Sequence, residues 1–117
     1  MTKSTKLTGI ISTHIAAINA HDTEAIVATF ADDALVNDVR REFWGRDAIR
    51  GFIAKEIVGD RVTMEITEVI ERGAETVVRS KYDGTYDKTN LPAELILTNY
   101  FTVKDGKITT LIIIQNK

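Results

Sequence analysis

Apolar residues in the first part of the chain recur every three or four positions, which is the spacing of one face of an α-helix. This run consists of Leu7, Ile10, Ile11, His14, Ile15 and Ile18. Alanines between these positions favour the helix by propensity, and the segment from Asn19 to Asp22 is typical of its end. The sequence therefore predicts a first helix with His14 on its inward face.

Two further helices are predicted in the first half of the chain. A short one begins at Asp22 or Thr23 and runs through Phe30. The third runs from residue 48 to about residue 58, with Asp47 as its N-cap, because a carboxylate there accepts hydrogen bonds from the free backbone amides. The apolar face of this third helix holds Ile49, Phe52, Ile53 and Ile57.

Alternation of apolar and polar residues, typical of strands, dominates the second half of the chain. Two short strands are predicted at 34–38 and 42–44. Four longer strands follow at 61–71, 75–86, 94–103 and 107–115. Short turns such as Lys104-Asp105-Gly106 join antiparallel neighbours, so the second half predicts a four-strand meander. Helices first and strands afterwards indicate the α+β class, with helices packed on one face of a curved antiparallel sheet.

The last two strands carry apolar residues on both of their faces. One face has Ile96, Tyr100, Ile112 and Ile114, and the other has Leu95, Leu97, Phe101, Leu111 and Ile113. A sheet with one wet face would alternate apolar and polar residues instead. No spare helix remains to cover the second face, so we expect a homodimer formed through the outer face of the sheet.

Composition narrows the classes of function. The 117 residues form a single domain with a net charge of -2 and no basic block, so nucleic-acid binding is not expected. Cysteine is absent, which excludes thiolate catalysis and cysteine-ligated metals. The two histidines are not part of a ligand-spaced cluster, and neither a metal nor another cofactor is expected. Without a signal peptide or a membrane-length apolar run, a cytoplasmic protein with no membrane contact is predicted.

Several motifs along the chain resemble those of one superfamily. They are Ala17-Ile-Asn-Ala-His-Asp, Phe30-Ala-Asp-Asp-Ala, Asp38, Trp44-Gly-Arg-Asp-Ala-Ile-Arg and Val103-Lys-Asp-Gly-Lys-Ile. Together they resemble the NTF2-like superfamily over nearly the whole chain, residues 1–117. That superfamily includes ketosteroid isomerases and SnoaL-type polyketide cyclases, and the resemblance implies a cone-shaped sheet with three helices on its concave face. The same fold carries many chemistries, so the resemblance specifies fold more strongly than function.

Ketosteroid isomerases provide the comparison for a candidate site. In that family a carboxylate base stands shortly after the Phe-Ala-Asp-Asp-Ala motif, where this chain has Asp38. The tyrosine and the protonated aspartate of the family's oxyanion hole fall on His14 and Asn99. Both replacements argue against a true steroid isomerase, although histidine and asparagine can each donate a hydrogen bond.

Each of these three residues also has a purely structural interpretation. Asp38 acts as a base only beside an acidic C–H group, and the alternative is that it pairs with Arg40 or Arg41 in the following turn. His14 either lines a pocket or is a core histidine with its hydrogen bonds satisfied. Asn99 lies among apolar residues on its strand face, so it either lines a pocket or bonds to a neighbouring element.

A hydrophobic cavity for a small molecule is expected between the sheet and the helices. Its predicted ligand-binding residues are Phe30, Trp44, Phe52, Ser80, Tyr82 and Phe101. For the aromatic members, ordinary core packing is the competing interpretation.

Three functions remain open at this point. The leading one is a cofactor-independent isomerase or cyclase acting on a small apolar carbonyl compound. Asp38 would then move a proton, and His14 and Asn99 would stabilise the enolate oxygen, each donor contributing about 3 kcal/mol. The second is a non-catalytic domain that binds a hydrophobic small molecule, and the third is a partner-binding domain with a vestigial pocket.

Overall fold

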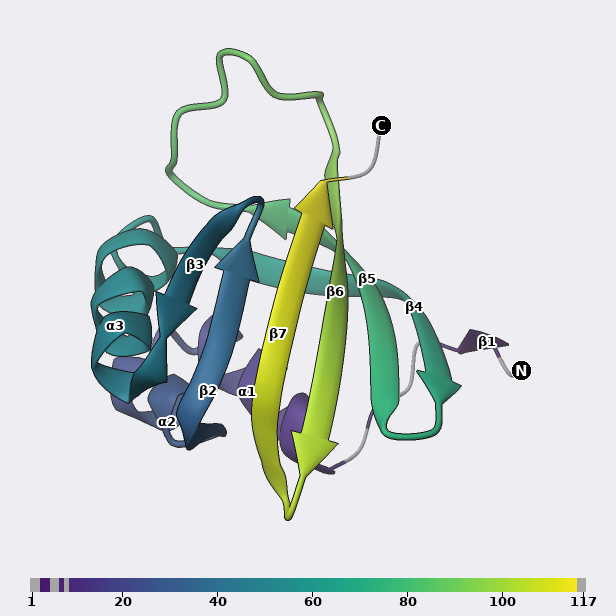
Figure 1. Ribbon diagram of the computed structural model, residues 1–117. Coiled ribbons are helices and arrows are strands. Elements are labelled where there is room, and N and C mark those ends of the chain that lie inside the picture. The colour runs from purple at the N-terminus through teal and green to yellow at the C-terminus, as the bar shows by residue number, and fades with distance from the viewer. Residues whose placement is uncertain (1–2, 5–6, 8, 116–117) are drawn as a thin grey trace.

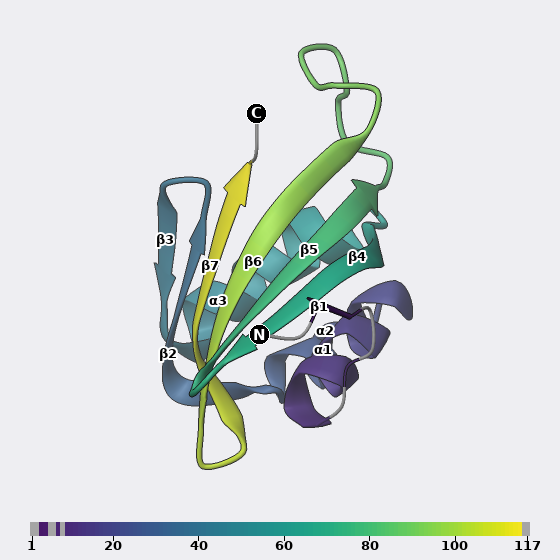
Figure 2. The ribbon, with the colours of Figure 1, turned by 90° about the vertical axis from the view of Figure 1, so that its right-hand side faces the viewer.

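The computed structural model describes residues 3–4, 7 and 9–115 (Figure 1). Within them, helices α1 (Gly9–Asn19), α2 (Thr23–Val27) and α3 (Gly45–Phe52) pack on one side of a curved sheet (Figure 2). Helix α3 continues as a π-helix, η1. The remaining elements are η1 (Ile53–Val58), β1 (Lys3–Ser4), β2 (Phe30–Asp38), β3 (Arg41–Trp44), β4 (Thr63–Arg72), β5 (Glu75–Asp83), β6 (Leu95–Lys104) and β7 (Lys107–Gln115). The predicted α+β class, with helices on the concave face of the sheet, is confirmed.

The predicted meander forms the body of the sheet. Strands β4, β5, β6 and β7 pair antiparallel in chain order, with β5 ending at Asp83, before the predicted end at Tyr86. The strand order across the described sheet is β1-β4-β5-β6-β7-β2-β3. Strand β2 pairs with β7 in parallel, so the sheet is mixed rather than wholly antiparallel. Parallel neighbours need a long connection instead of a tight turn, and local turn residues therefore do not reveal this pair.

Two helix boundaries differ from the prediction. Helix α2 ends at Val27, and Phe30 begins β2 instead of continuing the helix, so the predicted end was wrong. Phe30 is still buried, because the inner face of a strand buries an aromatic ring as well as a helix face does. Helix α3 begins at Gly45, with Trp44 at the cap position rather than Asp47. Asp47 lies in the first helical turn, where a negative charge is favourable.

The core lies between the concave face of the sheet and the helices. Its fully buried apolar side chains come from both layers: Ile26 and Ile49 from helices, and Phe30, Val36, Val78, Phe101 and Ile108 from strands. Burial of each such side chain stabilises the fold by about 1.5–3 kcal/mol. The core therefore fixes the helices against the sheet.

The convex face of the sheet carries no helix within the described residues (Figure 2). Trp44, Ile112 and Ile114 are exposed by 63%, 36% and 46%. Trp44 pairs with Leu35 at the sheet edge, so its side chain shares this outer face. The apolar character expected of the second face is present, and the homodimer stays a prediction.

Candidate functional site

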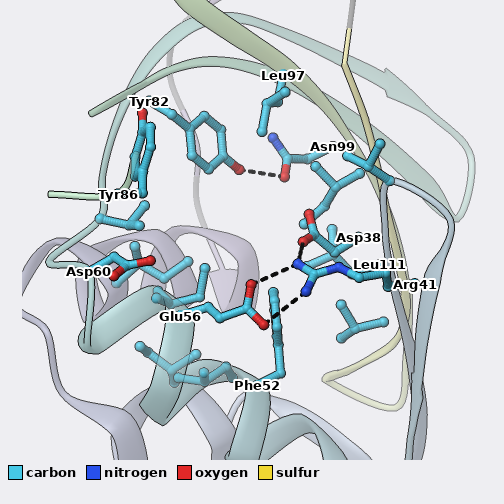
Figure 3. A pocket seen from close by; sticks show the side chains of 18 of the residues that line it. Asp38, Arg41, Phe52, Glu56, Asp60, Tyr82, Tyr86, Leu97, Asn99 and Leu111 are labelled. Atoms are coloured by element: carbon cyan, nitrogen blue, oxygen red, sulfur yellow. Dashed lines mark hydrogen bonds and ion pairs between the residues drawn. The ribbon is translucent and has the colours of Figure 1, made fainter. Parts of the chain in front are cut away.

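A cavity of about 380 Å³ lies between the concave face of the sheet and the helical layer (Figure 3). Most of its wall is apolar, with contributions from Ile18, Phe52, Ile53, Ile57, Val36, Leu95, Leu97, Leu111 and Ile113. The polar residues within it include His14, Asp38, Tyr82 and Asn99. A concave, mainly apolar space with a few converging polar groups is the usual form of a small-molecule site.

Asp38 ends β2 and places its carboxylate at the cavity, with 19% of the side chain exposed. Nη2 of Arg41 donates to Oδ2 of Asp38 at 2.5 Å. The same guanidinium donates to Oε2 and Oε1 of Glu56, at 2.9 and 2.7 Å (Figure 3). Because Arg41 lies on β3 and Glu56 on η1, one side chain ties the β2–β3 hairpin to the helical layer. Asp38 thus both lines the cavity and makes the ion pair that was its alternative interpretation.

The hydrogen bond to Glu56 and then the one to Asp38 raise the pKa of Arg41 beyond its already high range. The guanidinium is therefore a permanent positive charge between two carboxylates. Half of its side chain is exposed, so solvent screens these ion pairs and their contribution to stability is small. Their main effect is to orient the Asp38 carboxylate.

A strained turn places Arg41 opposite Asp38. The two connecting residues, Val39 and Arg40, have φ angles of 47° and 75°, as in type I′ turns, which favour Asn-Gly. A β-branched residue is rare at positive φ. Oδ1 of Asn37 accepts a hydrogen bond from the Arg40 amide at 2.9 Å, which supports the turn. Strained backbone concentrates at functional sites, and Val39 itself lines the cavity.

Asn99 is buried on β6 and bonds to two neighbours of the sheet. Its Nδ2 donates to the carbonyl oxygen of Val78 at 3.1 Å, and its Oδ1 accepts from the Tyr82 hydroxyl at 2.8 Å (Figure 3). A carbonyl only accepts, so the orientation of the amide is determined. Burial raises the pKa of Tyr82 above its ordinary value, and its hydroxyl keeps its proton at neutral pH.

His14 is almost fully buried on α1. Its Nδ1 lies 3.0 Å from the hydroxyl oxygen of Thr29, which in turn donates to the carbonyl oxygen of Ile26 at 2.6 Å. The rings of Phe30 and Phe101 meet the imidazole edge-on, with centroids 5.3 and 5.5 Å away. Burial lowers the pKa of His14 from 6.5 to about 4. The imidazole is therefore neutral at physiological pH, and it also lines the cavity.

The structure brings three of the six predicted ligand-binding residues to the cavity. Phe30, Phe52 and Tyr82 contribute to its wall. Phe101 is fully buried against His14 and lies behind the wall. Ser80 is also fully buried, and within the described part of the chain its hydroxyl has no hydrogen-bond partner. Phe101 and Ser80 therefore belong to the core around the site.

Trp44 requires a correction. It was expected to line the cavity, but it lies on the convex face of the sheet, where its Nε1 donates to Oε1 of Glu42 at 3.1 Å. The reason is register: Trp44 pairs with Leu35, while the inner positions of β3 and β2 are Phe43 and Val36. Phe43 points inward and stacks on the cavity residue Phe52, with ring centroids 4.5 Å apart.

Glu56 was not predicted from the sequence as a site residue, and Arg41 was predicted only as a possible partner of Asp38. A signal for Glu56 was available, because it follows Phe52 by four positions and shares its helix face. The link between Tyr82 and Asn99 had no local signal, since the two residues lie on different strands.

The described residues contain no group of three or more histidine or acidic side chains close enough to hold a metal ion. None of their helices combines the length and the apolar character needed to cross a membrane.

Comparison with known proteins identifies the family. Residues 11–111 match the model of the SnoaL-like domain, and the chain belongs to this family of NTF2-like fold. A candidate polyketide cyclase of Sinorhizobium meliloti is 30% identical, with 92% of this chain and 95% of that chain covered and a TM-score of 0.82. The comparison with curated proteins found no match.

Two more distant structures show the same fold. SalBIII, an epoxide hydrolase/cyclase-like enzyme of pyran ring formation in salinomycin, is 22% identical over 92% of this chain and 88% of its own, with a TM-score of 0.80. A Catenulispora acidiphila protein with a ketosteroid isomerase-like fold is 19% identical over 93% and 86%, with a TM-score of 0.79.

Proposed function

We propose that this domain is a cofactor-independent isomerase or cyclase that moves a proton on a small apolar carbonyl compound. The observation that carries the proposal is the Asp38 carboxylate in the wall of a mainly apolar cavity of about 380 Å³. The apolar wall suits the body of such a substrate, and the carboxylate is a proton acceptor. The similarity to a candidate polyketide cyclase supports this class of reaction.

In the proposed reaction Asp38 takes a proton from the carbon next to the substrate carbonyl. The electron pair of that C–H bond moves toward the carbonyl oxygen and forms an enolate. In an isomerisation, Asp38 returns the proton to a different carbon. In a cyclisation, the enolate carbon attacks a second carbonyl carbon of the same molecule, whose oxygen then receives the proton.

Arg41 and the Tyr82–Asn99 pair support this chemistry. Arg41 occupies Oδ2 of Asp38, while Oδ1 has no hydrogen-bond partner among the described residues and is the proposed proton acceptor. The enolate oxygen needs donors. We assign this role to the amide hydrogen of Asn99 that is not bonded to Val78, and to the Tyr82 hydroxyl once it turns from Asn99.

A specific observation favours the second candidate, a non-catalytic domain that binds a hydrophobic small molecule. Two polar side chains of the cavity already have partners without a ligand: Asp38 has Arg41, and Asn99 has Tyr82 and Val78. With these two side chains paired inside the protein, the apolar wall can hold an apolar molecule without any chemical step.

Proton exchange on a probe ketone separates the two functions. The probe is 2-tetralone in D₂O, and proton NMR follows both its binding and the loss of its α-hydrogens. An enzyme accelerates this exchange, and Asp38→Asn abolishes the acceleration without loss of fold. Asp33→Asn, which changes an exposed carboxylate of the same strand, serves as the control. Binding without accelerated exchange supports the binding domain, and full exchange in Asp38→Asn contradicts the role of Asp38.

We also propose that two copies associate through the convex face of the sheet. The exposure of Trp44, Ile112 and Ile114 on this face supports the proposal. Light scattering at micromolar concentration is expected to give twice the mass of the chain, and Ile114→Lys to give the monomer mass. A monomeric wild-type protein would contradict the dimer. The cytoplasmic location stays a prediction.

A further inference from the structure

The hydrogen bonds around His14 determine which ring nitrogen carries its proton. Thr29 has a single hydroxyl hydrogen, and it is donated to the carbonyl oxygen of Ile26 at 2.6 Å. Only lone pairs of the Thr29 oxygen remain for Nδ1 of His14, 3.0 Å away. A hydrogen bond between these two atoms therefore requires the hydrogen to be on Nδ1.

The other nitrogen of the ring then has a free lone pair. His14 is neutral because burial holds its pKa near 4, and a neutral imidazole has only one N–H group. Nε2 has no hydrogen-bond partner among the described residues. His14 lines the cavity. With Nδ1 directed at Thr29, Nε2 is the ring nitrogen that remains for a ligand in that space.

We propose that Nε2 of His14 is a hydrogen-bond acceptor that selects ligands carrying a hydroxyl group at the inner end of the cavity. The inference rests on the proposed function, since it requires a small molecule in that cavity. It also changes the role expected of His14. A lone pair facing an enolate oxygen repels it, so His14 receives a proton donor of the ligand, and the carbonyl lies toward Tyr82 and Asn99.

Thr29 acts as a positioning residue in this arrangement. If the hydrogen were on Nε2, lone pairs of Nδ1 and of the Thr29 oxygen would face each other at 3.0 Å. Leaving a buried acceptor without a donor costs about 1–3 kcal/mol. The Thr29 hydroxyl donates to the carbonyl oxygen of Ile26, and it cannot rotate toward His14 without breaking that hydrogen bond. Thr29, which does not line the cavity, therefore determines the preference for a hydroxyl-bearing ligand by fixing the tautomer of His14.

The tautomer can be measured without any ligand. Long-range ¹H–¹⁵N correlation spectra of the full chain at alkaline pH distinguish the two forms of each imidazole. We expect His14 to carry its hydrogen on Nδ1 and His21 on Nε2, because Nε2 of His21 lies 3.1 Å from the carbonyl oxygen of Val62, which only accepts. Thr29→Ser keeps the His14 form and Thr29→Val loses it. A hydrogen on Nε2 of His14 in the wild-type protein would overturn the inference.

Selectivity is tested with a pair of probes, 2-naphthol and 2-methoxynaphthalene, which differ in the hydroxyl hydrogen. Chemical-shift titration of the wild-type protein is expected to show about three- to tenfold tighter binding of 2-naphthol, the effect of one hydrogen bond. His14→Phe keeps a flat ring but removes the acceptor, and abolishes the preference. His21→Phe, the same change at the other histidine, retains it.

The outcomes separate this inference from the proposed function. Equal binding of both probes by the wild-type protein, or a preference that survives in His14→Phe, overturns the acceptor role and leaves the ligand cavity intact. Failure of both probes to bind contradicts the ligand cavity itself and removes the basis of the inference. Thr29→Val leaves His14 in place, so its spectra remain informative even if His14→Phe does not fold.

Discussion

Asp38 and Asn99 both pair with the same residue, Ile113, from its two sides. Strand β2 brings Asp38 to Ile113 in parallel register, and β6 brings Asn99 to it in antiparallel register. Cross-strand partners share a face of the sheet, so all three side chains point to the concave side. Because β7 lies between β2 and β6, the Cα atoms of Asp38 and Asn99 are two strand spacings apart, which is about 10 Å. The space above Ile113 is where a substrate would lie between the proposed base and the proposed donor.

A larger residue at position 113 should therefore block the cavity. Ile113→Phe is expected to abolish binding of 2-tetralone, because the ring would extend into the space between Asp38 and Asn99. Its cost in unfolding free energy is expected to be at most about 3 kcal/mol. Chemical-shift titration measures the binding, and Ile112→Phe, one residue away on the convex face, is the control that keeps it. Unchanged binding in Ile113→Phe would remove this cavity as the ligand site.

Arg41 should matter for turnover more than for stability. Arg41→Gln removes the charge that orients Asp38 and leaves Asp38 and Glu56 as two like charges at the cavity. Half-exposed ion pairs contribute only about 0–1 kcal/mol, so urea unfolding should change little. Deuterium exchange of 2-tetralone is expected to fall by about tenfold, which corresponds to roughly 1.4 kcal/mol. Arg40→Gln, in the same turn, should leave exchange unchanged, and equal rates in both variants would contradict the orienting role.

The sequence predicted the fold well where the signals are local. Helical periodicity located α1, and alternation with turn residues located the meander of β4 to β7. The first half of β2 was missed because Asp32 and Asp33 interrupt the alternation, and the β2–β7 pairing is irregular between Phe30 and Leu35. A strand interrupted in this way has no clear period-2 pattern.

The candidate site was predictable only in part. The resemblance to ketosteroid isomerases pointed to Asp38, His14 and Asn99, and the structure brings all three to one cavity. Arg41 was foreseen as a possible partner of Asp38, because it lies three residues away in the same hairpin. The partners of His14 and Asn99, Thr29 and Tyr82, were not foreseen, because their side chains meet through geometry that no sequence period encodes. These partners determine which side-chain atoms of the site residues remain available for a ligand.

The strained turn before Arg41 offers a stability gain. Replacing Val39 and Arg40 together by Asn and Gly supplies the residues that positive φ favours in a hairpin. Because an L residue in this conformation costs about 1–2 kcal/mol, the double variant is expected to gain about 1 kcal/mol in urea unfolding. Gly106→Ala is the reverse control: its φ is also 75°, nothing lies within 4 Å of the added Cβ, and it should lose stability by a similar amount. A destabilised double variant would show that the turn is not strained.

The buried His14 should make stability depend on pH. Its pKa is 6.5 in the unfolded chain and about 4 in the folded chain. Above pH 6.5 the imidazole is neutral in both the folded and the unfolded chain, so it does not make the unfolding free energy depend on pH. Between pH 6.5 and 4 the unfolded chain binds a proton that the folded chain excludes. The unfolding free energy therefore falls with decreasing pH by about 1.4 kcal/mol per pH unit, or roughly 3 kcal/mol in total.

Urea unfolding of wild-type protein and of His14→Gln across this range measures that slope. Carboxylates titrate in both proteins, so the difference between their curves isolates His14. The unfolding free energy of the wild-type protein minus that of His14→Gln is expected to be constant above pH 6.5. It should decrease steadily toward pH 4, because only the wild-type protein has the buried imidazole whose unfolded form binds a proton. Parallel curves for wild-type protein and His14→Gln would mean that His14 takes up its proton without unfolding, and that the cavity admits water to the imidazole.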